Sequence, residues 1–211
     1  MDAPYRSAVT PDGPRLLAGY RLIAKLAAGR LGPVWLAENS DSGEHLCIKQ
    51  LDTTTPAMIA ELRRAAALSH RNACALSEVL IVDGKHYLVM GYVQGGLLSE
   101  LGSEKRLVAG IAMQVHNVFA AAHKVGLVHG ALTPNDVLVS MEGRAVVLGF
   151  GTARFRRGAT SSVKADRVAL ARLFGDSTDV TPLTEQVIGL RVALACAQKI
   201  RHERALLSAR T

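Results

Sequence analysis

The chain has 211 residues, which is enough for one large domain or two small lobes around a buried core. Hydrophobic residues make up 49% of the chain, which excludes a disordered protein. The net charge of +7 permits an anionic partner, but the basic residues are scattered, and 154–158 is the only tight basic cluster. Because no basic patch is interleaved with aromatic residues, a nucleic-acid-binding protein is kept only as a further alternative.

Cysteine usage and hydropathy indicate the cellular compartment. Cys47, Cys74 and Cys196 are far apart, and no two of them have the spacing of metal ligands. The first residues are polar and rich in proline, without the apolar core of a signal peptide, and no apolar run is long enough to span a membrane. We therefore expect a cytoplasmic protein that has no metal site and no contact with a membrane.

The first part of the chain has the pattern of an antiparallel sheet with one helix. Residues 1–18 are expected to form a flexible lead-in. Strands separated by glycine-containing turns are predicted at 20–26, 33–38 and 46–51. A helix is predicted at 53–70, with Pro56 near its start, and two further strands lie around Asp83-Gly84 within 75–93. These elements predict an N-terminal lobe at 19–93.

The second part of the chain is mainly helical. A boundary is predicted at the glycines of 94–96, and a long apolar helix follows at 106–126. Residues 144–150 are strand-like. Further helical patterns occupy 163–175 and 183–207. The sequence therefore predicts a helical C-terminal lobe at 94–211.

The order of these elements resembles the eukaryotic-like Ser/Thr protein kinases of bacteria, over residues 19–174. The resemblance implies an α+β fold of two lobes, with an antiparallel sheet and one helix in the N-terminal lobe. The chain that follows Gly151 is shorter than in the family, and we therefore expect a truncated helical C-terminal lobe.

One motif of the resemblance is the phosphate-binding loop. The family's glycine-rich hairpin lets bare backbone approach phosphates, and "AAGRLGPV" (27–34) matches it at Gly29, Gly32 and Val34. The motif departs from the family at Ala27 and Pro33. A plain β-turn needs the same glycines, so this alternative stays open.

A second motif is the lysine that holds phosphates. "LCIK" places Lys49 at that position, and the resemblance implies that Glu61 of the following helix pairs with it. The alternative is that both are surface charges. The resemblance also implies that Val34, Cys47 and Leu138 sandwich an adenine. We expect that ATP, if it binds, does so without Mg²⁺ and that no cofactor is required.

The third motif is the catalytic loop, in "LVHGALTPNDVLV" (127–139). His129 matches the family's histidine, but Ala131 stands where the family has the aspartate that accepts the substrate proton. Asp136 stands at the metal-holding asparagine, and Gly149 replaces the metal-binding aspartate of the family's Asp-Phe-Gly motif. Asp136 is therefore the sole, weak candidate for a metal ligand.

The parts of the motifs that match the family are structural. His129 and Phe150 match positions that stack in a hydrophobic column, and Asp166 matches the helix aspartate that anchors the catalytic loop. Because frame residues are present where chemical groups differ, we expect a catalytically inactive kinase-like protein, a pseudokinase, that acts as a scaffold or allosteric protein-binding module. The alternatives are a weak or partner-activated Ser/Thr protein kinase and a rewired ATP-dependent transferase.

Two segments are candidates for binding a protein partner. The apolar positions of 187–200 exceed one helical face and are expected to contact another protein or a second copy in a homodimer. The threonines of 176–184 are candidate targets of an active kinase, and a phosphothreonine there would suit a phosphothreonine-reading domain. The alternative is that these threonines cap a helix.

Overall fold

The computed structural model describes residues 15–29, 31–101, 105–156, 158–175 and 182–208. They fall into two compact units. The first contains the described residues up to Ala67 together with Ala75–Tyr92, and the second contains Leu68–Cys74 and the described residues from Val93 onward. The segment 68–74, which the sequence analysis placed in the N-terminal lobe, thus belongs to the second unit.

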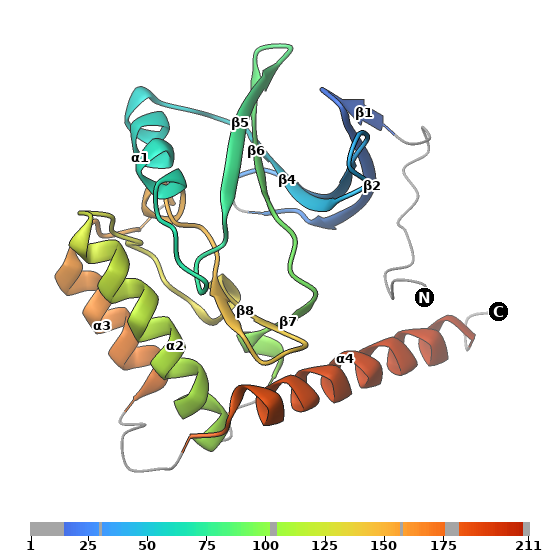
Figure 1. The fold of residues 1–211 in the computed structure, drawn as a ribbon, viewed down its shortest axis with the longest axis vertical. Helices are drawn as coiled ribbons and strands as arrows, with labels where there is room; N and C mark the ends of the chain where they lie inside the picture. Colours follow the sequence, from blue (N-terminus) through green and yellow to red (C-terminus); the bar gives the residue numbers. More distant parts are fainter. Residues whose placement is uncertain (1–14, 30, 102–104, 157, 176–181, 209–211) are drawn as a thin grey trace. The chain divides into compact units, whose positions relative to one another are not determined.

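The first unit is an antiparallel sheet of six strands with the order β1-β2-β3-β4-β6-β5 (Figure 1). Its strands are β1 (Arg15–Leu17), β2 (Tyr20–Ala27), β3 (Val34–Asn39), β4 (His45–Leu51), β5 (Leu76–Val82) and β6 (Lys85–Gly91). The strand β1 lies inside the range that was predicted to be flexible, because its residues pair with β2 in a short hairpin. The other five strands match the predicted ones.

Helix α1 (Pro56–Ala66) follows β4 and begins where the sequence predicts. The Thr55 side chain accepts a hydrogen bond from the Met58 N–H, and Pro56 occupies the first turn, where no donor is needed. The predicted hairpin of β5 and β6 is confirmed as well. Its turn residues, Asp83 and Gly84, have φ values of 50° and 72°, as a type I′ turn requires.

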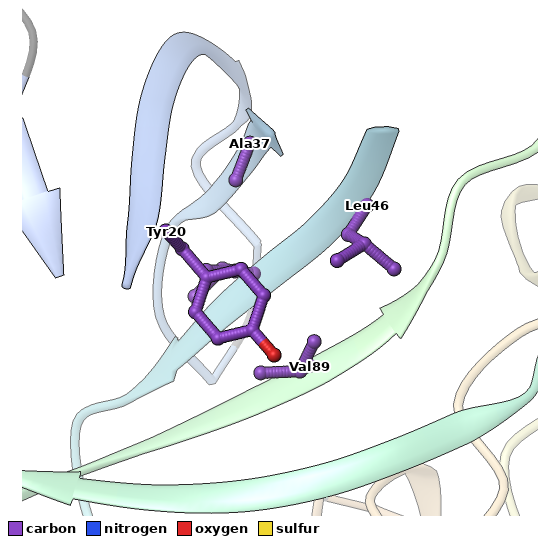
Figure 2. Close-up of a cluster of buried hydrophobic side chains, with 5 residues drawn as sticks. Tyr20, Ala37, Leu46 and Val89 are labelled. Carbon is purple, nitrogen blue, oxygen red and sulfur yellow. The ribbon is translucent and has the colours of Figure 1, made fainter. Parts of the chain in front are cut away.

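One cluster of buried side chains in the first unit lies on one face of this sheet (Figure 2). Strands expose alternate residues to opposite faces, so neighbouring strands bring buried side chains to the same layer. This layer consists of Tyr20, Ala37, Leu46, Ile48 and Val89. Ile48 and Val89 face each other across β4 and β6 and are fully buried. The Tyr20 hydroxyl donates a hydrogen bond to the Glu78 carboxylate.

The second unit combines helices with an antiparallel sheet of the order β7-β8-β9. Its strands and α-helices are β7 (Gly95–Leu97), α2 (Lys105–Lys124), β8 (Val137–Ser140), β9 (Ala145–Val147), α3 (Val163–Phe174) and α4 (Glu185–Ser208). Helices α2 and α3 lie side by side (Figure 1). Strand β7 was not predicted. A Cβ at Gly95 would lie 2.0 Å from the Val139 carbonyl oxygen, so only glycine fits at this position. Because glycine has a low propensity for strands, the sequence did not indicate β7.

Hydrogen bonds explain why 68–74 belongs to the second unit. The Asn72 amide donates to the Ala145 carbonyl (2.7 Å) and to Gln114 Oε1 (3.0 Å). Arg71 donates two hydrogen bonds of 3.0 Å to Glu185, near the start of α4. None of the helices in the described ranges is both long and apolar enough to cross a membrane.

Candidate active site

The loop at 129–136 is held by Asp166, a fully buried residue in the first turn of α3. Its carboxylate accepts hydrogen bonds from the backbone N–H groups of His129 (3.0 Å) and Gly130 (2.7 Å). The His123 Nε2 lies 2.8 Å from the same carboxylate. Helix α3 is fixed in turn at its N-terminus, where the Ser162 hydroxyl accepts from the Ala165 N–H. Asp166 therefore couples the loop to two helices.

His129 is a structural residue of this loop. It is fully buried, and its ring meets Phe150 edge to face, with a centroid distance of 5.3 Å. Phe119 of α2 packs against both rings. Burial lowers the pKa of His129, so the ring is neutral at pH 7. In the tautomer that fits, Nε2–H donates to the Leu148 carbonyl (2.9 Å), and Nδ1 faces the Ala131 N–H.

An open groove of about 650 Å³ lies beside Ala131 within the second unit. Leu132 and Pro134 from the loop and Val168 from α3 give the groove an apolar lining, and Val168 is exposed. The lining also includes the exposed side chains of Lys164 and Arg172 on α3. The groove therefore combines an apolar surface with positive charge.

Asp136 closes the same loop and forms an ion pair. Its Oδ1 lies 2.6 Å from Arg156 Nη2, and both side chains are largely buried, with 5% and 12% exposure respectively. Its Oδ2 accepts hydrogen bonds from the Thr133 N–H (2.9 Å) and hydroxyl (2.7 Å). Burial opposes ionisation of Asp136, but the Arg156 guanidinium and the Thr133 hydroxyl outweigh it. The pKa of Asp136 is therefore below its ordinary value.

Gly149 lies next to this ion pair. Its φ is +87°, and a Cβ built on it would lie 3.1 Å from Arg156 Nη2 and 3.7 Å from His129 Nε2. The guanidinium thus occupies the space between positions 136 and 149, where the resemblance places a metal. Mg²⁺ requires oxygen ligands in octahedral geometry. The described residues near this point supply one carboxylate, both of whose oxygens are engaged, so they do not fit Mg²⁺.

In the first unit, Val34, Cys47 and Lys49 lie on adjacent strands. Lys49 of β4 is opposite Val34 of β3 and Leu88 of β6. Cys47 and Lys49 are two residues apart on one strand, so they share the face opposite the buried Ile48. Nucleotide binding by these three residues stays a prediction.

The partners expected for that face stay predictions. Glu61 is buried on α1, with Oε2 3.4 Å from Arg64 Nη1. Its pairing with Lys49 remains a prediction. Leu138 lies on β8 in the second unit, and the adenine slot that includes it also remains a prediction.

The glycines of the predicted phosphate loop serve the backbone of the loop itself. A Cβ at Gly29 would lie 2.1 Å from the Gly32 carbonyl oxygen, and a Cβ at Gly32 would lie 2.2 Å from that of Gln50. Both glycines have positive φ values. The close approach to Gln50 joins the loop to β4. These contacts account for both glycines without a nucleotide, so phosphate binding at this loop stays a prediction.

Comparison with known protein families shows to which family the chain belongs. The model of the protein kinase domain family matches residues 20–172. The chain belongs to this family. The predicted kinase-like α+β fold is therefore confirmed, with an antiparallel sheet and one helix preceding a reduced set of helices.

The curated relatives include plant and bacterial Ser/Thr kinases. CBL-interacting serine/threonine-protein kinase 19 of Arabidopsis thaliana is 31% identical over 147 residues, which cover 64% of this chain and 30% of the relative. Serine/threonine-protein kinase Pkn1 of Myxococcus xanthus is 30% identical and is covered over 22% of its length, again by 64% of this chain. A probable serine/threonine-protein kinase PknB of Lactococcus lactis is 30% identical, over 64% of this chain and 24% of the relative. The chain thus spans less than a third of these relatives.

These findings correct one expectation from the sequence. We predicted that the chain is not an enzyme, because of Ala131 and Gly149. That prediction is wrong, since the chain belongs to a family of enzymes, and the relatives named above are Ser/Thr protein kinases. The match to the family covers 20–172 and so includes both of these positions.

Sequence reasoning missed Arg156 and His123. Arg156 lies in the basic cluster at 154–158, which the sequence analysis left without a role, and it meets Asp136 across twenty residues of chain. His123 meets Asp166 from another helix. No spacing rule connects such pairs. The signal that could have suggested the Arg156 contact is Asp136, which stands where the family has an asparagine and which has a basic cluster later in the chain.

The segments expected to bind a partner are only partly described. Of the threonine-rich segment 176–184, residues 176–181 lie outside the described residues. On α4, Val187, Leu190 and Leu194 are exposed by 41%, 63% and 53%. Ile188 and Val192, on another side of the helix, are fully buried.

Proposed function

We propose that the chain is a weak or partner-activated Ser/Thr protein kinase that transfers the terminal phosphoryl group of ATP to a protein hydroxyl. The observation that carries this proposal is the Asp166 carboxylate, which holds the backbone of His129 and Gly130 in a chain of the kinase family. Phosphoryl transfer passes through a loose transition state, for which positioning contributes much of the rate. A fixed loop serves that purpose even where one acid–base group differs.

The side chain at 131 sets the expected rate. A methyl group cannot accept the proton of the attacking hydroxyl, and a positioned general base contributes roughly 10²–10⁴ in rate. Kinases typically turn over at about 1–100 s⁻¹. We therefore expect the isolated chain to turn over at roughly 10⁻⁴ to 1 s⁻¹.

The groove beside Ala131 supports activation by a partner. Its apolar lining suits an amphipathic segment, and Lys164 and Arg172 favour negative charge on that segment. We propose that an acidic segment of a partner protein binds there and places a carboxylate near Ala131. Such a carboxylate would supply the proton acceptor in trans.

Transfer of labelled phosphate tests the kinase activity. Purified enzyme in excess over a protein substrate should transfer phosphate from γ-labelled ATP, and Lys49→Ala should abolish the transfer. Lys85→Ala, on the same sheet but exposed, is the matched control and should retain it. Transfer by the wild type at the level of Lys49→Ala would contradict the proposal and would assign any residual signal to a contaminant.

Two variants, one single and one double, test the role of position 131 and of the groove. Ala131→Asp should raise the rate of the isolated chain by roughly 10²–10⁴, because it restores an acceptor next to the loop. A synthetic peptide of glutamate and leucine should raise the wild-type rate, and Lys164→Glu with Arg172→Glu should remove this activation. Arg167→Glu, exposed on the same helix and outside the groove lining, should not. An unchanged rate in Ala131→Asp would show that proton acceptance does not limit turnover.

A further inference from the structure

We propose that the Arg156 guanidinium takes the place of a divalent cation and binds a phosphate group of the nucleotide, so that ATP binds without Mg²⁺. The inference rests on the proposed function, since it assumes that ATP is the substrate. It adds the residue that contacts the phosphate and the metal independence of that contact.

The position of Arg156 is the first step. Its Nη2 lies 2.6 Å from Asp136 Oδ1 and 3.1 Å from the Cβ position of Gly149. A metal held by side chains at 136 and 149 would occupy the same space. The left-handed φ of +87° at Gly149 and the absence of a side chain there make room for the guanidinium. A positive charge is thus already part of the polypeptide at this point, although it is one unit and not the two of a divalent cation.

The chemistry of the guanidinium is the second step. An arginine side chain carries a positive charge in proteins and presents several N–H donors in a planar fork. Nη2 is directed to Asp136, and the side chain keeps 12% exposure, so Arg156 is not sealed off from solvent. Phosphate oxygens match such a fork with two parallel hydrogen bonds. Asp136 therefore orients the guanidinium, and the phosphate is expected to bind to N–H groups that Asp136 does not occupy.

The exclusion of Mg²⁺ is the third step. A cation that approached Asp136 would meet the arginine charge and would find both carboxylate oxygens already bonded. Displacing Arg156 would leave a largely buried guanidinium without its carboxylate, which is costly. In an alternative mechanism, Arg156 would move aside when Mg²⁺ binds. Removal of the Arg156 side chain would then increase Mg²⁺-dependent ATP binding, whereas our proposal predicts weaker ATP binding.

Equilibrium binding of ATP to the full chain, in EDTA and in Mg²⁺, tests the proposal. Wild type should bind ATP in EDTA, and Mg²⁺ should change the affinity little. Arg156→Gln should weaken binding in EDTA by roughly 10- to 100-fold, and Mg²⁺ should not restore it. Arg156→Lys, which keeps the charge and loses the fork, should fall between. Arg154→Gln is the control from the same basic cluster; its Nε is bonded to Ser161, and affinity should be unchanged.

A variant with the opposite expected sign guards against misfolding. Asp136→Asn removes the negative charge that offsets Arg156 and should tighten binding in EDTA, which a merely damaged protein would not do. Circular dichroism checks that each variant is folded. Three results would overturn the proposal: ATP binding by wild type only with Mg²⁺, unchanged affinity in Arg156→Gln, or a gain of Mg²⁺-dependent binding in Arg156→Gln.

The binding assay also separates this inference from the proposed function. If ATP binds only with Mg²⁺ while phosphate transfer is observed, the role of Arg156 is wrong and the kinase activity stands. If no nucleotide binds under either condition, both proposals fail.

Discussion

Asp166→Asn changes one buried atom and should destabilise the second unit more than any surface substitution. The wild-type carboxylate accepts from the His129 N–H at 3.0 Å and from the Gly130 N–H at 2.7 Å, and it lies 2.8 Å from His123 Nε2. An asparagine keeps one acceptor oxygen and presents an NH₂ group to the remaining donors. At least one buried backbone N–H then loses its acceptor.

The expected size of this effect follows from those contacts. Hydrogen bonds to a charged group contribute about 1.5–3 kcal/mol each, and a buried donor without a partner costs about 1–3 kcal/mol. Because one hydrogen bond survives and His123 can turn to accept from the new amide, we expect Asp166→Asn to lower the free energy of unfolding by about 2–4 kcal/mol. The conservative size of the substitution leaves packing unchanged.

Urea unfolding monitored by circular dichroism, combined with hydrogen exchange, measures this effect. The amides of His129 and Gly130 should lose protection in Asp166→Asn. Arg167→Gln, the next residue on α3 and an exposed one, is the control and should change stability by less than about 0.5 kcal/mol. If Asp166→Asn also stays below about 0.5 kcal/mol with both amides protected, the carboxylate does not hold the loop and the reasoning is wrong.

Two further predictions concern pH and thiol chemistry. Burial raises the pKa of Cys74 to about 11, so this thiol should react slowly with iodoacetamide at pH 9. Mass spectrometry should show Cys74 unmodified in the folded protein and alkylated after unfolding. Equal labelling of Cys74 in both states would contradict this prediction. The pKa of Asp136 is depressed, so its stabilising contribution is present above about pH 4 and is lost as the pH falls through the folded-state value. In Arg156→Gln, burial still raises the pKa of that carboxyl, while the guanidinium that lowers it is gone. The loss of stability relative to wild type should therefore be largest at pH 7 and should shrink towards pH 4, as urea titrations at both pH values can measure. A constant difference would show that the ion pair does not control this ionisation.

The sequence by itself determined the elements whose signals are local. Thr55 and Pro56 start α1 because a cap and a proline act within one turn of the chain. Asp83 and Gly84 fix the hairpin because a two-residue turn sets the register of its strands. The phosphate-loop glycines were located in the same way, although their nearest contacts are with the backbone of the loop and of Gln50.

Only the tertiary structure decided the contacts between residues that are distant in the chain. It placed Arg156 on Asp136, bound the segment around Asn72 to the second unit and paired a glycine-rich strand with β8. The physical reason is that the type of residue, be it an arginine, an asparagine or a glycine, does not indicate which distant residue it will contact. Its position is fixed by the buried donors and acceptors that folding brings together, since each of these must be satisfied. The chemistry of the candidate site therefore depends on a pairing that spacing along the chain does not reveal.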